Sequence, residues 1–261
     1  MNLKCQTSAI KDLEIQAKAD RHSVMIEGPT GSGKSYLAKS YAKMLGVSDF
    51  VSVKSTVDDI RKSIDSCYSI ESKVVVCIEN LDSGVLAASY TLLKFLEEPK
   101  DNVYIVITCC NMYDVPDTII SRSSVVQLAS PTRDDLKQFS SSYPEMKRKM
   151  VESRPAIWNS VKNFVDVDYA MNLSSTYCDH LENLINVVKS KRPVSDSVWT
   201  ICHYPDNSEV PVKFAIQCII SNTKDSVVKK HAIKCIEALN NSRVAQHAIV
   251  SKFMMECKYG D

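Results

Sequence analysis

The chain has 261 residues, of which 44% are hydrophobic and 24% charged, and its formal net charge is +1. This length favours about two domains, and the composition is that of a soluble globular protein able to bury a core. The nearly balanced charge excludes a strong field over the whole molecule, so any contact with nucleic acid requires a local basic patch.

The first half of the chain alternates helical and strand-like patterns. In chain order, we expect a helix over 9–19, a strand over 24–26, a helix over 36–45, a strand over 51–53, a helix over 57–67, a strand over 74–78, a helix over 86–96, and strands over 104–108 and 125–128. Such alternation with continuous apolar strands predicts a parallel sheet covered by helices on both faces. The fold class of this half is therefore α/β.

The second half is predicted to be helical. Ser130-Pro131-Thr132 marks a boundary, and Thr132 is a capping residue for a helix that begins at Arg133. The later helices are expected over 176–189, 211–221, 226–238 and 244–257, with irregular stretches around 192–193 and 203–207. We expect three parts, which are the α/β domain over 1–130, a small helical lid over 131–170 and an all-helical domain over 171–261.

Membrane and metal classes are not favoured by the sequence. Residues 1–5 lack the apolar core of a signal sequence, and the longest apolar stretch, 103–110, is too short to cross a bilayer. We expect a cytoplasmic protein with no membrane partner. Ten cysteines without a signal sequence indicate reduced thiols, and since no two form a C-x-x-C pair, structural zinc is not expected.

The most informative motif lies between the first strand and the second helix. The run Gly28-Pro29-Thr30-Gly31-Ser32-Gly33-Lys34-Ser35 meets every position of the phosphate-loop pattern G-x-x-x-x-G-K-[ST]. Glycines let the backbone curl around phosphates, and the helix that follows adds its partial positive charge. Lys34 is expected to reach the β- and γ-phosphates and Ser35 to bind Mg²⁺. The motif predicts a site for ATP and Mg²⁺.

Motifs after the phosphate loop narrow the class of nucleotide protein. The apolar strand over 74–78 is followed by Glu79, at the place where a phosphate-loop ATPase has a second Mg²⁺ carboxylate. The sequence L-L-K-F-L-E-E-P begins 13 residues after Glu79, at Leu92, and Ser121-Arg122-Ser123 follows the next strand.

With these motifs the chain resembles the ATPase subunits of sliding-clamp loaders, which include the bacterial gamma/tau and delta-prime subunits, replication factor C and phage loaders. Residues 92–99 match the L-L-K-x-L-E-E-P motif without a break, and residues 121–123 are similar to the S-R-C loop. Residues 57–61 are similar to V-D-D-I-R, residues 115–119 to L-P-x-T-I, and residues 238–244 to the loop before the last collar helix. The resemblance is dense over 23–128 and thin after 133.

The resemblance implies an AAA+ module, a helical lid and a helical collar that joins subunits into an open ring of five. Such rings open a sliding clamp with ATP bound and close it around primer-template DNA, which they grip without regard to sequence. The implied partners are other loader subunits, the clamp and the DNA, in the cytoplasm, or in the host cytoplasm if the protein is viral. Arg122 is implied to be the arginine finger for a γ-phosphate held by a neighbouring subunit.

Several positions depart from the family pattern. The usual Asp-Glu pair is Glu79-Asn80, which keeps a carboxylate for Mg²⁺ but replaces the catalytic glutamate by an amide that cannot act as a base. If the alignment is shifted by one residue, the Asp-Glu pair is still incomplete. Asp82 is a candidate to replace the catalytic glutamate. The polar sensor position falls on Cys110, with Asn111 beside it as a substitute. In the lid, the family has an arginine that senses the nucleotide, and Arg154 is the candidate, although it lies one residue before the expected position.

These departures lead to a hypothesis and leave two alternatives open. The chain is expected to bind Mg·ATP but to hydrolyse it slowly unless a neighbour supplies the missing groups, because Asn80 occupies the catalytic position. The first alternative is a passive, delta-prime-like ring member that binds nucleotide and presents Arg122 to its neighbour. The second is an AAA+ helicase loader, against which the unbroken motif over 92–99 counts.

Overall fold

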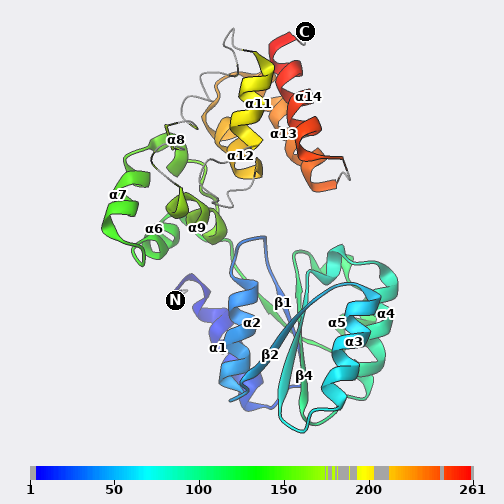
Figure 1. Ribbon diagram of the computed structural model, residues 1–261. Coiled ribbons are helices and arrows are strands. Elements are labelled where there is room, and N and C mark those ends of the chain that lie inside the picture. The colour runs from blue at the N-terminus through cyan, green and yellow to red at the C-terminus, as the bar shows by residue number, and fades with distance from the viewer. Residues whose placement is uncertain are drawn as a thin grey trace. The chain divides into compact units, whose positions relative to one another are not determined.

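The computed structural model describes residues 4–173, 175, 178–179, 181, 188, 193–202, 212–241 and 244–259. The chain folds into two compact units, Asn2–Asp135 and Leu136–Asp261. The first unit contains a sheet and its covering helices, and the described part of the second is helical (Figure 1). Helix α6 (Arg133–Ser140) carries the chain from one unit into the other.

The first unit is organised around a parallel sheet of five strands. The strands are β1 (Ser23–Glu27), β2 (Asp49–Lys54), β3 (Val74–Glu79), β4 (Val103–Cys109) and β5 (Ser124–Gln127). Their order is β2-β3-β4-β1-β5, and neighbouring strands pair in parallel. All five carboxyl ends therefore lie at one edge of the sheet, where the loops after β1, β3 and β4 meet.

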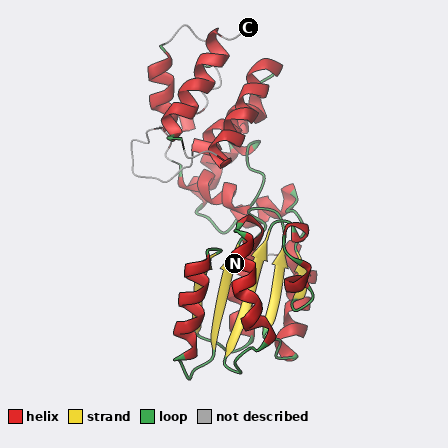
Figure 2. Ribbon diagram, turned by 90° about the vertical axis from the view of Figure 1, so that its right-hand side faces the viewer, coloured by secondary structure: helices red, strands yellow, loops and turns green. Residues whose placement is uncertain are grey.

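Helices cover both faces of this sheet. Helices α1 (Thr7–Lys18) and α2 (Lys34–Met44) lie on one face, and α3 (Val57–Tyr68), α4 (Leu86–Glu97) and α5 (Asp117–Ile120) lie on the other. Figure 2 shows the strands side by side between these helical layers. The predicted α/β fold is confirmed, and each strand begins and ends within two residues of its expected position.

The core of the sheet explains why the strands could be found from their apolar runs. Every residue of β4, and every residue of β3 except Glu79, is buried. On one face, Val76 and Ile107 pack in a cluster with Ile64 of α3 and Leu92 of α4. Burial of each such side chain contributes about 1.5–3 kcal/mol. Continuous apolar strands are thus required because helices exclude water from both faces.

Local capping fixes two helix starts that the sequence indicated. Thr56 caps α3, since its Oγ1 accepts a hydrogen bond from Asp59 N (3.2 Å) and donates one to the Asp59 carboxylate (2.7 Å). Thr132 makes the same pair of contacts with Asp135 at the start of α6. Each Asp lies in the first turn of its helix, where the helix dipole favours negative charge. The predicted cap at Thr132 is confirmed.

The second unit is helical throughout its described part, apart from the connecting turns. After α6 come α7 (Glu145–Glu152), α8 (Pro155–Trp158), α9 (Phe164–Asn172), α11 (Val194–Cys202), α12 (Val212–Asn222), α13 (Ser226–Asn241) and α14 (Gln246–Tyr259). Among the described residues, none of the helices is long and apolar enough to cross a membrane.

Some of the sequence predictions differ from the structure. Helices α5 and α11 were not predicted. Pro193 belongs to a predicted irregular stretch and is irregular, directly before α11. Helix α13 continues to Asn241, so the first residues of the segment similar to a collar loop are helical. Most of the expected helix over 176–189 and the whole irregular stretch 203–207 lie outside the described residues.

Candidate nucleotide-binding site

The phosphate-loop motif connects β1 to α2 at the carboxyl edge of the sheet. Gly31 and Gly33 adopt positive φ angles of 76° and 102°, a region that other residues avoid. Gly28 is required for another reason, since a Cβ there would lie 2.7 Å from Leu128 Cβ and 2.9 Å from Ser32 Oγ. The glycines of the motif therefore give the loop its curvature and its close approach to Leu128, which follows β5.

Lys34 is folded back over this loop. Its Nζ atom donates hydrogen bonds to the carbonyl oxygens of Gly28 (2.6 Å) and Pro29 (3.2 Å) and contacts Cys110 Sγ at 3.3 Å. Only 7% of the residue is exposed. A nucleotide must draw Lys34 out of these contacts in order to use its charge.

The start of α2 suits an anion. Its N-cap residue, Gly33, has no side chain with which to cap the first turn, and that turn contains no acidic residue. Amide groups at a helix start and the helix dipole attract phosphate oxygens. Ser35, the second residue of α2, is exposed. Together with Lys34, this end of α2 fits a triphosphate.

Gln6, a buried residue that no sequence motif marks, also binds the backbone of the loop. Gln6 Nε2 donates to the carbonyl oxygen of Ser32 (3.3 Å) and to that of Ala129 (2.8 Å). Ser32 Oγ is buried and has no hydrogen-bond partner among the described residues. A buried hydroxyl without a partner is costly, so a group bound at the loop would find a donor there. The tight Gly28 cradle and this hydroxyl fit a phosphate-bearing ligand.

Glu79 and Asn80 end β3 and differ in environment. The side chain of Glu79 is partly exposed, and its Oε1 accepts a hydrogen bond from Ser52 Oγ at 2.6 Å. Asn80 has a left-handed backbone, with φ 50° and ψ 57°, and its N–H donates to Thr108 Oγ1 at 3.0 Å. Asparagine adopts this conformation more readily than glutamate does. The turn after β3 thus gives a physical reason for Asn80.

Asp82 is half-buried and binds the end of β4. Its Oδ2 accepts hydrogen bonds from the N–H groups of Cys110 (2.9 Å) and Asn111 (3.2 Å). Its Oδ1 is buried and has no hydrogen-bond partner in the described part of the chain. A buried oxygen cannot accept a proton from an exposed water without rearrangement. Asp82 therefore positions the backbone at Cys110, which weakens the idea that it replaces the catalytic glutamate.

The two sensor candidates after β4 face different groups. Cys110 Sγ contacts Lys34 Nζ and lies 3.6 Å from Thr30 Oγ1. Asn111 instead caps a short 3-10 helix, since its Oδ1 accepts from Tyr113 N (3.2 Å) and its Nδ2 donates to Asp114 Oδ2 (2.8 Å). The structure thus brings Cys110 to the phosphate loop and gives the Asn111 side chain local partners.

Glu27, the last residue of β1, is a further acid at this edge that the sequence analysis passed over. Its Oε1 accepts from Met112 N (3.0 Å) and its Oε2 from Gln127 Nε2 (2.8 Å). Burial raises the pKa of the neighbouring Cys109 thiol to about 12, and the charges of Asp82 and Glu27 act in the same direction. That thiol therefore remains neutral, and Glu27 ties the end of β1 to the loop after β4.

Arg122 lies at the opposite edge of the sheet. It precedes β5, whose first residue, Ser124, pairs with Val24 near the start of β1, whereas the phosphate loop follows the end of β1. At about 3.3 Å per residue, the five residues of β1 separate these edges by about 16 Å. This distance is longer than an arginine side chain, so Arg122 cannot reach the phosphate loop of its own chain.

The guanidinium of Arg122 is held by two partners. Its Nη1 donates to the carbonyl oxygen of Thr118 (2.9 Å), and its Nη2 lies 3.0 Å from Glu97 Oε1. A cavity of about 390 Å³ opens beside it. The lining includes the polar residues Arg21, His22, Ser121, Arg122, Ser123 and Ser124.

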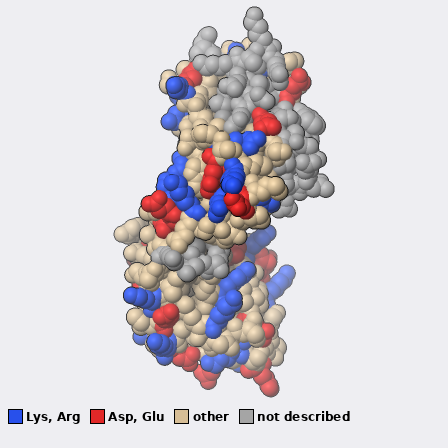
Figure 3. All heavy atoms as spheres, turned by 90° about the vertical axis from the view of Figure 1, so that its left-hand side faces the viewer, with Lys and Arg blue, Asp and Glu red and all other residues tan. Residues whose placement is uncertain are grey.

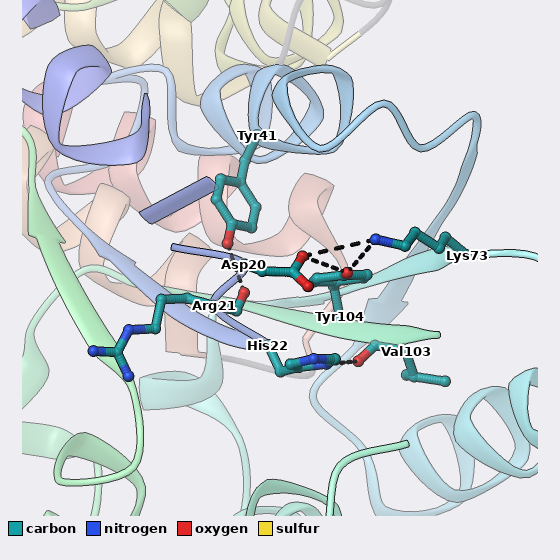
Figure 4. Close-up of polar contacts among 7 residues, drawn as sticks. All are labelled: Asp20, Arg21, His22, Tyr41, Lys73, Val103 and Tyr104. Carbon is teal, nitrogen blue, oxygen red and sulfur yellow. Dashed lines mark hydrogen bonds and ion pairs between the residues drawn. The ribbon is translucent and has the colours of Figure 1, made fainter. Parts of the chain in front are cut away.

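A polar cluster borders this cavity at the amino-terminal edge of the sheet (Figure 4). The Tyr104 hydroxyl donates to Asp20 Oδ1 (2.7 Å) and accepts from Lys73 Nζ (2.8 Å), while the His22 ring stacks on Tyr104 at 4.7 Å. The pKa of Asp20 is lowered, chiefly by this hydrogen bond from Tyr104. The pKa of Lys73 is raised, chiefly by its bond to the same hydroxyl. The cluster joins the turn after α1, the residue before β3 and strand β4.

Arg154 lies in the second unit. Its Nη1 donates to the Met150 carbonyl (3.0 Å), and its Nη2 forms an ion pair with Asp179 Oδ1 at 2.7 Å. On the face of the molecule drawn in Figure 3, basic side chains are interspersed with acidic ones. That face offers no broad basic patch for a nucleic acid among the residues drawn in colour.

Comparisons with known families agree with the motifs. A family model described as DNA polymerase III, delta subunit, matches residues 48–132, and one described as Magnesium chelatase, subunit ChlI, matches residues 1–65. Each covers less than half of the chain. A search of curated proteins finds no match.

Solved structures with the same fold cover nearly the whole chain. A DNA polymerase III gamma subunit-related protein from Thermotoga maritima matches 96% of this chain and 98% of its own, with a TM-score of 0.58 and 15% identity. The RuvB Holliday junction branch migration motor of T. maritima matches 96% of this chain and 83% of its own, with a TM-score of 0.51 and 14% identity. At such identities the likeness shows the fold, which is that of AAA+ phosphate-loop proteins. With the delta-subunit match, it supports the resemblance to clamp-loader-type AAA+ ATPases.

Proposed function

We propose that this chain is an ATPase subunit of a sliding-clamp loader, which binds Mg·ATP at residues 28–35 and helps to open a clamp and load it onto primer-template DNA. The observation that carries the proposal is the placement of the phosphate loop and Arg122 at opposite edges of one sheet. Each chain thus offers a nucleotide site at one edge and, at the other, an arginine that cannot reach that site.

This placement favours a head-to-tail assembly. Contacts between two different edges of successive subunits generate a ring if the rotation closes. Arg122 of one subunit then completes the nucleotide site of the next, where a fixed guanidinium stabilises the charge that develops on the transferred phosphoryl group. The family resemblance supplies the number of five for the ring.

Within its own site, the chain contributes groups that bind and orient the triphosphate. Lys34 leaves its loop carbonyls to meet the phosphates, and the amide groups at the start of α2 hold their oxygens. Ser35 and Glu79 would hold Mg²⁺, whose charge neutralises part of the charge on the phosphates. We infer slow hydrolysis because Asn80 cannot take a proton from the attacking water.

We assign the helical half of the chain, from residue 131 on, to assembly and to sensing of the nucleotide. We infer that residues 131–170 form a lid and residues 171–261 a collar that joins neighbouring subunits. Arg154 serves as a lid sensor only if it exchanges its ion pair with Asp179 for a phosphate. Contacts with DNA are expected mainly on the phosphate backbone, which makes binding salt-dependent and indifferent to sequence.

A passive ring member is the second candidate, and the left-handed Asn80 favours it. Such a subunit keeps Arg122 for its neighbour but does not turn over its own ATP. A helicase loader is the remaining alternative. These three functions differ in assembly and in turnover.

The test is the native mass of the chain copurified from its source with Mg²⁺ and a non-hydrolysable ATP analogue. An assembly of five subunits that includes a different protein and recruits a ring-shaped clamp supports the loader. A homohexamer contradicts it in favour of a helicase loader. A lone chain that retains no nucleotide contradicts ATP binding itself.

A further inference from the structure

The ion pair between Arg122 and Glu97 joins two motifs that the sequence treats separately. Glu97 is the last residue of α4 and the first Glu of the motif over 92–99, whereas Arg122 belongs to the loop before β5. Nη2 and Oε1 are 3.0 Å apart, and Nη1 donates to the Thr118 carbonyl at the start of α5. Two elements of fixed position therefore hold one guanidinium.

The position of Glu97 is determined by the packing of its helix. Leu92, Phe95 and Leu96 are buried, so the apolar residues of the motif anchor the last turns of α4 to the sheet. Glu97 and Glu98 follow and are exposed. Because the preceding side chains cannot shift without loss of packing, Glu97 is presented to Arg122 from a rigid support.

We propose that Glu97 is a positioning residue for Arg122 and holds its guanidinium at the rim of the 390 Å³ cavity, facing the triphosphate of a neighbouring subunit. This inference rests on the proposed function. A guanidinium has five N–H donors, and Thr118 and Glu97 engage two of its nitrogens. The remaining donors stay available for phosphate oxygens.

The exposure of the pair indicates a geometric role. The side chains of Arg122 and Glu97 are 37% and 52% exposed, and ion pairs at such exposure contribute little to folding stability. The orientation of Arg122 matters more for the reaction rate, since a displacement of about 1 Å at a catalytic group lowers the rate about a hundredfold. Loss of Glu97 should therefore change turnover far more than it changes stability.

The first experiment needs no catalysis. The lone chain is treated with an arginine-specific dicarbonyl reagent, and modification of Arg122 is followed by mass spectrometry. In Glu97→Gln, Arg122 should be modified about threefold faster or more, whereas the control Glu98→Gln should match the parent. Equal rates in Glu97→Gln and the parent would overturn the pairing in solution.

The second experiment is a double-mutant cycle in the assembled ring, with kcat and KM for ATP as readouts. Glu97→Gln should lower kcat about tenfold with KM unchanged, and should cause no further loss in an Arg122→Ala background. Glu98→Gln should have no effect. An equal loss from Glu97→Gln in both backgrounds, or none in either, would overturn the positioning role.

The same cycle separates this inference from the proposed function. If Arg122→Ala alone retains full kcat in the ring, the arginine does not complete a neighbouring site and the proposed function fails. If Arg122→Ala loses activity while Glu97→Gln does not, the proposed function stands and the role of Glu97 is rejected. Binding of a fluorescent ATP analogue to the lone chain should be equal in all variants, which confirms that the phosphate loop is intact.

Discussion

Lys34 Nζ lies 3.3 Å from Cys110 Sγ, so the phosphate-loop lysine meets the end of β4 although 76 residues separate them. Among the ten cysteines, all of which lie in the described part of the chain, Cys110 is the one that is exposed. A single thiol thus lies within contact distance of the group that should bind the β- and γ-phosphates. This relationship makes the site open to chemical probing.

Alkylation of Cys110 should block nucleotide binding. A carboxamidomethyl group on Sγ would occupy the space into which phosphate oxygens must enter and would separate Lys34 from them. We expect affinity for a fluorescent ATP analogue to fall at least about tenfold after iodoacetamide treatment, as the loss of one charge-assisted hydrogen bond implies. Bound ATP should in turn slow the alkylation.

The variant Cys110→Ala serves as the control for this experiment. It should keep most of its nucleotide affinity, because alanine leaves Lys34 and the loop backbone in place and adds no bulk at the phosphates, and it should be insensitive to iodoacetamide. An equal loss of binding in treated Cys110→Ala would assign the effect to another thiol and contradict the placement of Cys110 at the phosphates.

Asn80→Glu should raise turnover in the assembled ring by at least about tenfold, since general-base groups contribute 10²–10⁴-fold. The same substitution should lower the stability of the fold. Glutamate in the left-handed conformation of residue 80, with φ 50°, should destabilise the fold by about 1–2 kcal/mol.

Steady-state ATP hydrolysis and urea denaturation measure these two effects separately. Asn80→Gly is the matched control, because glycine accepts the same backbone without supplying a carboxylate, and it should not accelerate hydrolysis. If Asn80→Glu is no faster than the parent, either the alignment of this residue or the idea of a missing base is wrong.

Gly28→Ala should weaken both folding and nucleotide binding. The added Cβ would clash with Leu128 Cβ at 2.7 Å, and relief of that clash must move the loop. We expect a loss of about 1–3 kcal/mol in the free energy of unfolding, by urea denaturation, together with a lower affinity for the ATP analogue.

Gly46→Ala is the control that distinguishes a general loss of stability from a local effect at the phosphate loop. Gly46 has a φ of +70° but open space around it, and it follows α2 at the end far from the loop. This variant should lose about 1–2 kcal/mol from backbone strain and keep the nucleotide affinity of the parent. Equal affinity in Gly28→Ala and Gly46→Ala would show that the Gly28 cradle is irrelevant to the ligand.

Stability at low pH should depend on Asp20. The pKa of Asp20 is lowered in the folded protein, mainly because Tyr104 donates a hydrogen bond to its carboxylate. The folded state then binds this proton less tightly than the unfolded state does. The stabilisation is complete above the ordinary aspartate pKa of about 3.9 and is lost as pH falls through the lower folded value.

Urea midpoints between neutral pH and about pH 2 test this contribution. Asp20→Asn fits the left-handed backbone at residue 20 and removes the titration, so its midpoint should be lower than that of the parent at neutral pH and should converge with it in acid. Asp101→Asn, an exposed turn residue, should follow the parent. A constant gap between Asp20→Asn and the parent at every pH would contradict the role of this carboxylate.

The sequence predicted those features whose causes are local. Continuous apolar runs located the strands because both faces of the sheet are buried, and Gly31 and Gly33 were predictable because the loop needs their positive φ angles. The cap at Thr132 was predictable because it needs only an Asp three residues later. The spacing back from Arg122 put the sensor position at Cys110 with Asn111 as its substitute, but only the structure shows that Cys110 is the one beside Lys34.

The sequence did not predict contacts that depend on how distant segments meet. Gln6 reaches Ser32 and Ala129 across 26 and 123 residues, and no local pattern distinguishes it from a surface glutamine. The partner of Arg122 could not be chosen between Glu97 and Glu98 without the end of α4. Helix α5, with four residues, is too short to show a helical period.

The phosphate loop and Arg122 are separated by the length of β1, so the ATPase activity of the protein should depend on its own concentration. Under the proposed function, Arg122 completes the nucleotide site of a neighbouring chain, so hydrolysis per chain should decline as the protein is diluted, even with saturating ATP. At high dilution each chain would retain its nucleotide unused. Assembly would then activate hydrolysis, and ATP would be consumed only where the local concentration of subunits is high enough to form the ring.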